Sequence, residues 1–458
     1  MTNREDSEYL DAISRFICDA RLTHLPARVI ERCRWVIADS LPVIATGMQV
    51  TEMKLLSANY LASAAPGNAW VIGTGKRASA ADAALLNGTA GGWHELNEGS
   101  TGAKGHPGIQ VVPAAVAFAQ ETGACGSEVL LAVALGYEVS SRISRAAKTR
   151  FAVHPHGTWG TIGAAIAAGR LKAFSQPQMR QLINVAATMG LATSRNTLLE
   201  GATVRNIYTG HSGFMGLMAV RLVESGFIGE ADGVKSIYGS VIADGFSPEV
   251  VVADLGHEWM VGDGYFKLHP TGRGVHSAID ALEAALAKAP GGRIDTQNVE
   301  RIEVRTYNVS ASPAALLCGK VTNSFGAKFS IPFALGTLMH HGRSGVDCFD
   351  DAAVANPKVQ ALAARVQVQE EPAFTAAYPR QQNCSVKIVL NSGTAFEGRC
   401  TVMKGEPGNP HRTEELEKKF FELGATVWGM AVARRLYDGC MALEDIPDFR
   451  EFTAELSL

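Results

Sequence analysis

The stretch WHELNEGSTGAKGHPGIQVVP, residues 93–113, places two histidines, two carboxylates, one lysine and four glycines between two apolar, alanine-rich segments. Reactive side chains interrupted by glycines, with apolar helical sequence on either side, are typical of a functional loop on a rigid scaffold. We therefore expect this loop to hold part of a functional site, with other segments of the chain converging on it.

Length and charge limit the kind of protein to which the loop belongs. The 458 residues exceed one ordinary core and predict two or three domains. The formal net charge is -3 and the chain has no run of Lys or Arg, so it lacks the clustered positive surface that phosphate binding needs. The sequence therefore argues against nucleic acid as the main partner.

The cysteine pattern and the terminal sequence indicate a soluble, cytoplasmic protein. The cysteines form no C-x-x-C pair and no cluster with histidine that would suggest zinc, so we expect reduced, mostly buried thiols. The N-terminal sequence is polar and acidic, unlike a secretory signal, and no run of about 18 apolar residues is present to span a membrane. The cysteines are Cys18, Cys33, Cys125, Cys318, Cys348, Cys384, Cys400 and Cys440.

Helical periodicity dominates the first 265 residues. The segment VIGTGK at 71–76 superficially matches a nucleotide-binding loop, but Arg77 follows the lysine and Trp70 replaces the upstream glycine. We interpret it as a turn. The predicted helices cover residues 9–21, 26–46, 78–92, 112–120, 127–148 and 214–225.

A helix rich in small residues follows the His-Pro turn at 154–155. Gly160, Gly163, Ala164 and Ala167 recur along it. Because glycine lowers helix stability, this many small residues imply that another backbone approaches closely. We expect this helix to be central and buried.

The composition changes near residue 266 and predicts a second domain. Residues 299–307 alternate like a half-buried strand, and 385–400 predict a hairpin that turns near 391–393. An apolar helix is expected over 328–342 between them. The predicted fold is mainly α with a smaller α+β domain: residues 1–265 and 404–458 form the helical domain, and 266–403 the smaller α/β domain.

Six motifs in order resemble the MmgE/PrpD family, which includes 2-methylcitrate dehydratase, cis-aconitate decarboxylase and iminodisuccinate epimerase. The resemblance covers nearly the whole chain. The motifs are NGTA at 87–90, HPGIQVVPA at 106–114, HPHGTWGTIGAA at 154–165, KLHP at 267–270 followed by His276, AKFSIPF at 327–333, and KGEPGNP at 404–410.

The resemblance implies a large helical domain built from both ends of the chain, with a smaller α/β lid domain over it. It places the active site in the cleft between them and implies a homodimer. Members of the family act on small di- or tricarboxylates and need no metal or organic cofactor.

Histidines and fixed cations are the expected chemical groups, because such reactions move a proton at carbon while anionic charge is held in place. A positioned acid or base contributes about 10²–10⁴-fold. His106 and His154 match the two loop histidines of the family and form the predicted acid/base pair. Each precedes proline, so the alternative is a His-Pro turn whose ring only caps a helix. Glu95 and Tyr208 are the further catalytic candidates.

The predicted substrate-binding groups are cations and one histidine. Arg205 stands where the family commonly has lysine, and its guanidinium cannot release a proton in proteins, so we assign it to carboxylate binding. His94 is expected to be structural, and the spacing of His269 and His276 matches no recognised zinc pattern. The predicted binding residues are Lys104, Arg205, Lys267, Arg273 and His276.

Two departures from the family pattern weaken assignment to a familiar substrate. Glu95-Leu96-Asn97-Glu98 replaces Asp-aromatic-Asp-Asp, and Phe333 stands where the decarboxylase has tyrosine. The sequence therefore predicts a cofactor-independent lyase or isomerase, with dehydration of a small polycarboxylate placed ahead of epimerisation and decarboxylation. The alternative is a non-catalytic protein that binds small acids.

Overall fold

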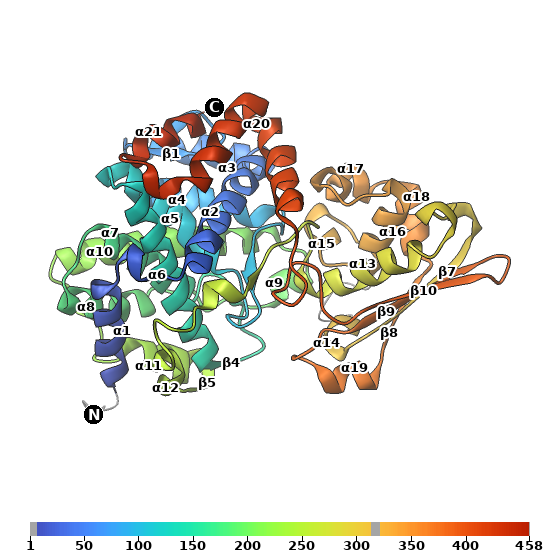
Figure 1. The fold of residues 1–458 in the computed structure, drawn as a ribbon, viewed down its shortest axis with the longest axis horizontal. Helices are drawn as coiled ribbons and strands as arrows, with labels where there is room; N and C mark the ends of the chain where they lie inside the picture. The colour runs from blue at the N-terminus through green and yellow to red at the C-terminus, as the bar shows by residue number, and fades with distance from the viewer. Residues whose placement is uncertain (1–6, 313–320, 458) are drawn as a thin grey trace.

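The computed structural model describes residues 7–312 and 321–457. A helical part contains the segments from both ends of the chain, and a smaller part combines a sheet with helices (Figure 1). No helix in these described ranges is long and apolar enough to cross a membrane. The fold is therefore mainly α-helical, with a mixed α/β second domain.

The helical part is assembled from fourteen α-helices among the described residues. The last two come from the C-terminal segment and pack against the first ones, so distant parts of the chain share one core. These helices are α1 (Glu8–Asp19), α2 (Ala27–Gly47), α3 (Thr51–Leu61), α4 (Ala80–Trp93), α5 (Pro107–Thr122), α6 (Gly126–Ala146), α7 (Gly160–Leu171), α8 (Gln176–Ala187), α9 (Asn196–Leu199), α10 (Ile207–Glu224), α11 (Gly233–Ser236), α12 (Pro248–Val252), α20 (Thr413–Met441) and α21 (Phe449–Thr453).

The smaller part has a four-stranded sheet in the order β10-β9-β7-β8. β7 (Val299–Thr306) pairs parallel to β8 (Val366–Glu370) and antiparallel to β9 (Cys384–Leu390), which forms the predicted hairpin with β10 (Ala395–Cys400). Its buried side chains form a second hydrophobic core. Its helices are α13 (Arg273–Leu286), α14 (Asn308–Ala311), α15 (Ser324–Ala327), α16 (Ile331–His341), α17 (Asp351–Val354), α18 (Pro357–Ala363) and α19 (Pro372–Ala377).

Three short antiparallel ribbons complete the helical part. The first, β1 (Ala69–Val71) with β2 (Lys76–Ala78), confirms that 71–76 is a turn. The second joins β3 (Gly99–Ser100) to β6 (Gly264–Tyr265). It ties the loop after α4 to the segment that leads into the smaller part. The third pairs β4 (Ala147–Thr149) with β5 (Ala243–Phe246).

The small residues of α7 allow the close helix packing that the sequence predicts. A Cβ atom added to Gly136 of α6 would lie 2.5 Å from the carbonyl oxygen of Gly163. Side chains larger than hydrogen would therefore force α6 and α7 apart. α7 is buried along most of its length, as expected for a central helix.

Three helices begin at positions that differ from the prediction. α5 begins at Pro107 rather than near 112, because proline is compatible with a first helical turn. α10 begins at Ile207 rather than Phe214. α16 begins at Ile331 rather than 328, since the Ser330 hydroxyl accepts the amide of Phe333 and caps the helix there.

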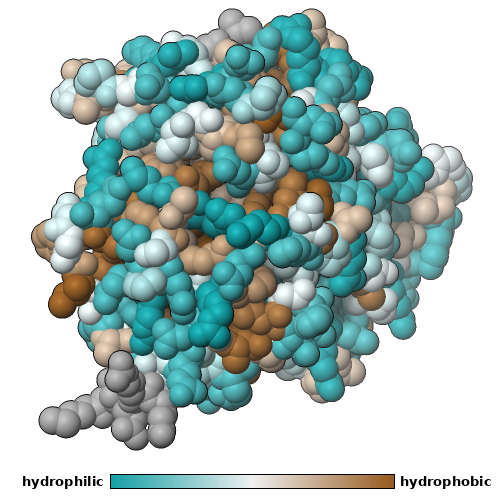
Figure 2. Space-filling model, turned by 60° about the vertical axis from the view of Figure 1, so that its left-hand side comes forward, coloured by the Kyte–Doolittle hydropathy of each residue, from teal (hydrophilic) through white to brown (hydrophobic). Residues whose placement is uncertain are grey.

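The surface of the helical part is mainly polar, with apolar patches on the face that Figure 2 shows. Large exposed apolar side chains include Phe151, Phe227 and Ile228. The homodimer implied by the family resemblance stays a prediction.

The described cysteines are all free thiols, and five of the seven are buried. Cys318 lies outside the described residues.

Candidate active site

Glu95 lies at the centre of a buried charge cluster formed by both parts of the chain. It follows α4 with a φ of 52°, in the left-handed region that costs energy for a residue with a side chain. Its carboxylate makes a close ion contact with Arg205, and its Oε2 atom lies 3.5 Å from the Lys267 ammonium. The Arg205 contact lacks hydrogen-bond alignment, so we treat it as an ion contact only.

These cations decide the charge state of Glu95. Burial alone would raise its pKa, but Arg205 and Lys267 overcome burial and hold the pKa at about 2. Both of its oxygens face cations. Glu95 is therefore better suited to orienting Arg205 and Lys267 than to accepting a proton.

His106 precedes α5, and its ring does not cap the helix. The ring Nδ1 lies 2.6 Å from the carbonyl oxygen of Glu98. A carbonyl only accepts, so Nδ1 carries the proton and Nε2 is left unprotonated. Burial, reinforced by Lys267, lowers the pKa of His106 to about 3. The ring is therefore a neutral base with its lone pair on Nε2.

His154 has a donor close to each ring nitrogen. Its Nδ1 lies 3.1 Å from the amide of His156, and its Nε2 lies 3.3 Å from Nε of Arg205. Burial, reinforced by Arg205, lowers its pKa well below the usual value. A neutral ring accepts at only one nitrogen, so both contacts cannot be hydrogen bonds. We assign the bond to Nδ1, the shorter contact, which leaves the proton on Nε2.

His156 lies between the other two rings. Its ring centroid is 5.0 Å from that of His106 and 4.8 Å from that of His154, both in edge-on contact. Its buried Nδ1 has no hydrogen-bond partner among the described residues. Burial, reinforced by Arg205, keeps its pKa well below the usual value. The site therefore holds three neutral imidazoles.

Tyr208 lies in the first turn of α10, and Arg205 lies in the short turn of residues Thr203–Asn206 just before it. The Tyr208 ring lies 5.5 Å from that of His154. The Arg205 guanidinium also faces Phe325 and Phe329 from the smaller part, with 5.7 and 5.9 Å to their ring centroids. Arg205 thus contacts both parts of the protein.

Residues 267–276 form the wall contributed by the smaller part. The Lys267 ammonium donates to the Thr271 carbonyl at 3.2 Å. Nε2 of the His276 ring lies 3.3 Å from that carbonyl, and its Nδ1 lies 3.3 Å from Nη1 of Arg273. Arg273 also pairs with Glu406 at 2.9 Å. The structure thus brings Lys267, Arg273 and His276 together at one side of the cluster.

Lys104 is not brought into this cluster by any contact among the described residues. Its ammonium donates to the Ala147 carbonyl at 3.1 Å, beside the end of α6. The Glu98 carboxylate has other partners than Glu95: it accepts hydrogen bonds from the Gly108 amide and, at 3.1 Å, from the Tyr137 hydroxyl. Burial raises the pKa of Glu98 to about 7. Both residues support the loop.

Comparison with known protein families shows to which family this chain belongs. The model of the MmgE/PrpD N-terminal domain matches residues 11–245, and that of the MmgE/PrpD C-terminal domain matches residues 269–443. The chain belongs to the MmgE/PrpD family. The resemblance inferred from the sequence motifs is confirmed.

Similar proteins in the MmgE/PrpD family include cis-aconitate decarboxylases. The chain is 24% identical over 468 residues to the cis-aconitate decarboxylase of Homo sapiens. The aligned region covers 95% of this chain and 92% of that protein. It is 23% identical over 457 residues to the cis-aconitate decarboxylase of Aspergillus terreus, and that aligned region covers 93% of this chain and 91% of that protein.

Two residues of this MmgE/PrpD protein escaped the sequence prediction. His156 lies within the 154–165 motif, at a position where the family pattern specifies no residue type. Lys328 lies within the 327–333 motif and is almost fully buried. A lysine within a recognised motif was a usable signal for a site residue. Nothing in a single sequence, by contrast, indicates that the His156 ring faces the other two rings.

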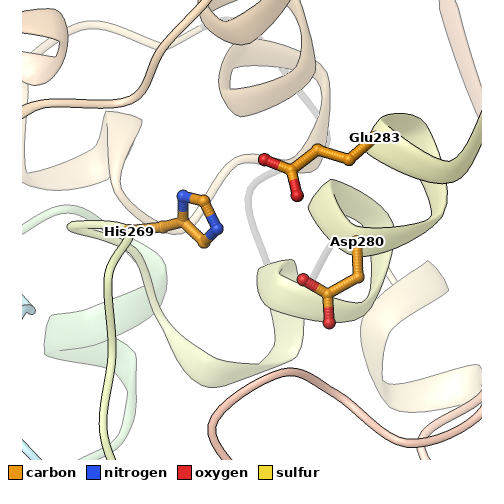
Figure 3. Close-up of side chains that lie close together, drawn as sticks. All are labelled: His269, Asp280 and Glu283. Atoms are coloured by element: carbon orange, nitrogen blue, oxygen red, sulfur yellow. The ribbon is translucent and has the colours of Figure 1, made fainter. Parts of the chain in front are cut away.

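One group outside the central cluster has the composition of a cation site. His269, Asp280 and Glu283 place ligand atoms within 4.8 Å of one another, and their side chains converge in Figure 3. Asp280 already accepts the Lys404 amide at 2.7 Å. Arg273 and Lys404 also lower the pKa of Asp280, against the larger effect of burial. These neighbours account for the Asp280 carboxylate without a metal, and we assign the group no chemical step.

Proposed function

We propose that the protein is a cofactor-independent lyase that moves a proton at a carbon next to a carboxylate of a small di- or tricarboxylate. The observation that carries the proposal is the hydrogen bond from His106 Nδ1 to the Glu98 carbonyl, at 2.6 Å. It leaves Nε2 as a base within a site that also holds Arg205 and Lys267. Membership of the MmgE/PrpD family supports this class of substrate.

Each group has a role in the proposed elimination of water. His106 Nε2 takes the proton from carbon, and the C–H electron pair forms the new double bond. The C–O bond breaks, and the leaving oxygen takes a proton from His154 Nε2 or the Tyr208 hydroxyl and departs as water. Arg205 and Lys267 stabilise the charge that develops on the substrate carboxylate, which is worth about 3–4 kcal/mol per well-placed donor.

Decarboxylation is the second candidate, because the similar proteins include cis-aconitate decarboxylases. In that reaction the C–C bond to a carboxylate breaks, carbon dioxide leaves, and the carbanion takes a proton from an imidazole N–H. We place dehydration first because Phe333 stands where the decarboxylase has a tyrosine. The replacement of the family lysine by Arg205 weakens both assignments to a familiar substrate.

Proton NMR in deuterated water tests the proposal. Purified protein is incubated with a panel of hydroxy- and unsaturated di- and tricarboxylates, with the His106→Ala variant as control. New olefinic signals indicate dehydration, loss of a carboxylate carbon indicates decarboxylation, and exchange with inversion at one carbon indicates epimerisation. Shifts on binding without exchange or product, across the whole panel, would favour a binding protein and overturn the proposal.

A further inference from the structure

Lys328 lies beside the charge cluster, on the smaller part of the protein. It lies in the chain between Phe325 and Phe329, whose rings both face the Arg205 guanidinium and have centroids 5.1 Å apart. Its backbone carbonyl accepts the Gly272 amide at 2.8 Å. The Lys328 backbone is therefore fixed against the same wall that carries Lys267.

Lys328 is a buried residue whose ammonium has no protein partner. The residue is 3% exposed, and its ammonium, which keeps some accessible surface, makes no hydrogen bond or ion pair with any described residue. The other buried lysines differ. Lys267 has Glu95 and the Thr271 carbonyl, and Lys419 has Asp39 at 2.5 Å and the Leu96 carbonyl at 2.7 Å. A buried charge without a partner is costly, which points to an anion that the protein itself does not supply.

The surrounding charges leave this cation uncompensated. Burial lowers the pKa of Lys328 to about 8, and Glu95 is the carboxylate that most opposes this effect. Glu95, however, is already in contact with Arg205 and Lys267. Asp351 and Glu52 also oppose the effect of burial on Lys328, but less than Glu95 does. Glu95 is therefore already occupied by two cations before Lys328 is counted, and a further carboxylate from a bound anion would balance the Lys328 charge.

We infer that Lys328 is a binding residue for a second carboxylate of the substrate, separate from the carboxylate held by Arg205 and Lys267. The inference rests on the proposed function, which supplies a substrate with at least two carboxylates. Lys328 then distinguishes dicarboxylates from ligands in which one carboxylate is replaced by a neutral group.

The affinities of two proteins for two small ligands, measured without turnover, test this role of Lys328. Calorimetric titrations measure the affinity of the wild-type protein and of Lys328→Met for succinate and for succinamate, in which an amide replaces one carboxylate. We expect Lys328→Met to weaken succinate binding by at least about tenfold, since truncation of a buried charge partner is costly. Succinamate affinity should change less than about twofold.

The matched control is Lys358→Met, an exposed lysine of α18 in the same part of the protein, which should leave both affinities unchanged. A second variant, Lys328→Gln, should reproduce the selective loss. Equal losses for both probes, no loss for succinate, or a wild-type protein that does not bind succinate would overturn the inference. Selective binding without turnover of any panel compound would instead overturn the proposed function and leave the subsite in place.

Discussion

At the scale of single residues, the imidazoles of the site are distinguished by hydrogen bonds rather than by charge. Burial lowers the pKa of His106, His154 and His156, so all three rings are neutral near pH 7. The carbonyl contact places the proton of His106 on Nδ1, and we assign the proton of His154 to Nε2 from the shorter of its two contacts. The same residue type can therefore supply a base at one position and an acid at another.

Removal of the proposed base tests this arrangement. We expect His106→Ala to lower kcat by at least about a hundredfold while the protein remains folded, because the ring does not cap α5. Turnover of the best panel substrate and thermal melting are the measurements. His24→Ala, at an exposed histidine, is the control. Near-normal turnover of both His106→Ala and His154→Ala would remove the acid/base pair.

The sequence predicted most of the central residues but not the directions of their side chains. Glu95, Arg205 and Lys267 are far apart in the chain, and only the resemblance to a family placed them together. Lys104 was predicted to join them because it is a cation in the same loop. The loop instead turns its side chain towards the Ala147 carbonyl. Periodicity cannot indicate that direction outside a helix or strand.

At the scale of elements, close packing of α4 against α10 positions Arg205 and Tyr208. A Cβ atom on Gly210 would lie 2.1 Å from the Leu85 carbonyl oxygen, and one on Gly88 would lie 2.7 Å from the Gly210 Cα. The sequence predicted an apolar helix here but placed its start at Phe214. The turn of α10 next to the site was therefore predicted as loop.

Gly210→Ala should push α10 away from α4. We expect a loss of about 1–3 kcal/mol in the free energy of unfolding, as for other overpacked sites, together with reduced turnover because Tyr208 moves. Urea denaturation and kcat measure the two effects. Gly262→Ala is the matched control, since a Cβ there meets nothing within 4 Å. Equal stability of the two variants would contradict this packing argument.

At the scale of the whole molecule, the C-terminal helix α20 supports the loop that carries Glu95. The Lys419 ammonium bonds Asp39 of α2 at 2.5 Å and the Leu96 carbonyl at 2.7 Å. The second Asp39 oxygen accepts the Glu98 amide at 3.1 Å. One buried ion pair thus joins α2, α20 and the loop.

Two adjacent lysines allow a controlled test of this support. Lys419→Met leaves Asp39 buried without its cation, so we expect a loss of about 3–5 kcal/mol in the free energy of unfolding and lower turnover. Lys418→Met removes only an exposed pair with Glu422, and we expect a change within about 0.5 kcal/mol. Chemical denaturation compares the two variants. A Lys419→Met protein as stable and active as Lys418→Met would show that the ion pair does not support the loop.

The buried histidines predict that the folded state weakens in mild acid. Their pKa values in the folded protein lie below the unfolded value of about 6.5, so below that pH the unfolded chain binds more protons and stability falls as the pH falls. Glu98 and Glu138 act in the opposite direction, because their folded pKa values of about 7 lie above their unfolded values. The six histidines outweigh them. They are His94, His106, His154, His156, His269 and His276.

Thermal melting at pH 8, 6.5 and 5 measures the balance. We expect the highest Tm at pH 8, where the histidines are neutral in both states, and a lower Tm at pH 6.5, where they are about half protonated in the unfolded chain. A clear further decrease should follow by pH 5. A Tm that is unchanged or higher at pH 5 would contradict the assignment of these rings as neutral.

The contribution of α20 to the helical part has a consequence for protein synthesis. On the ribosome, residues 413–441 emerge only after the whole sheet-containing segment 273–403. The hydrophobic core of the smaller part is drawn from residues 275–403 and can form as soon as that segment is translated. Asp39, by contrast, gains its ion pair only after Lys419, 380 residues later in the chain, has been translated. We therefore expect nascent chains to fold the smaller part before the loop that carries Glu95 reaches its final position.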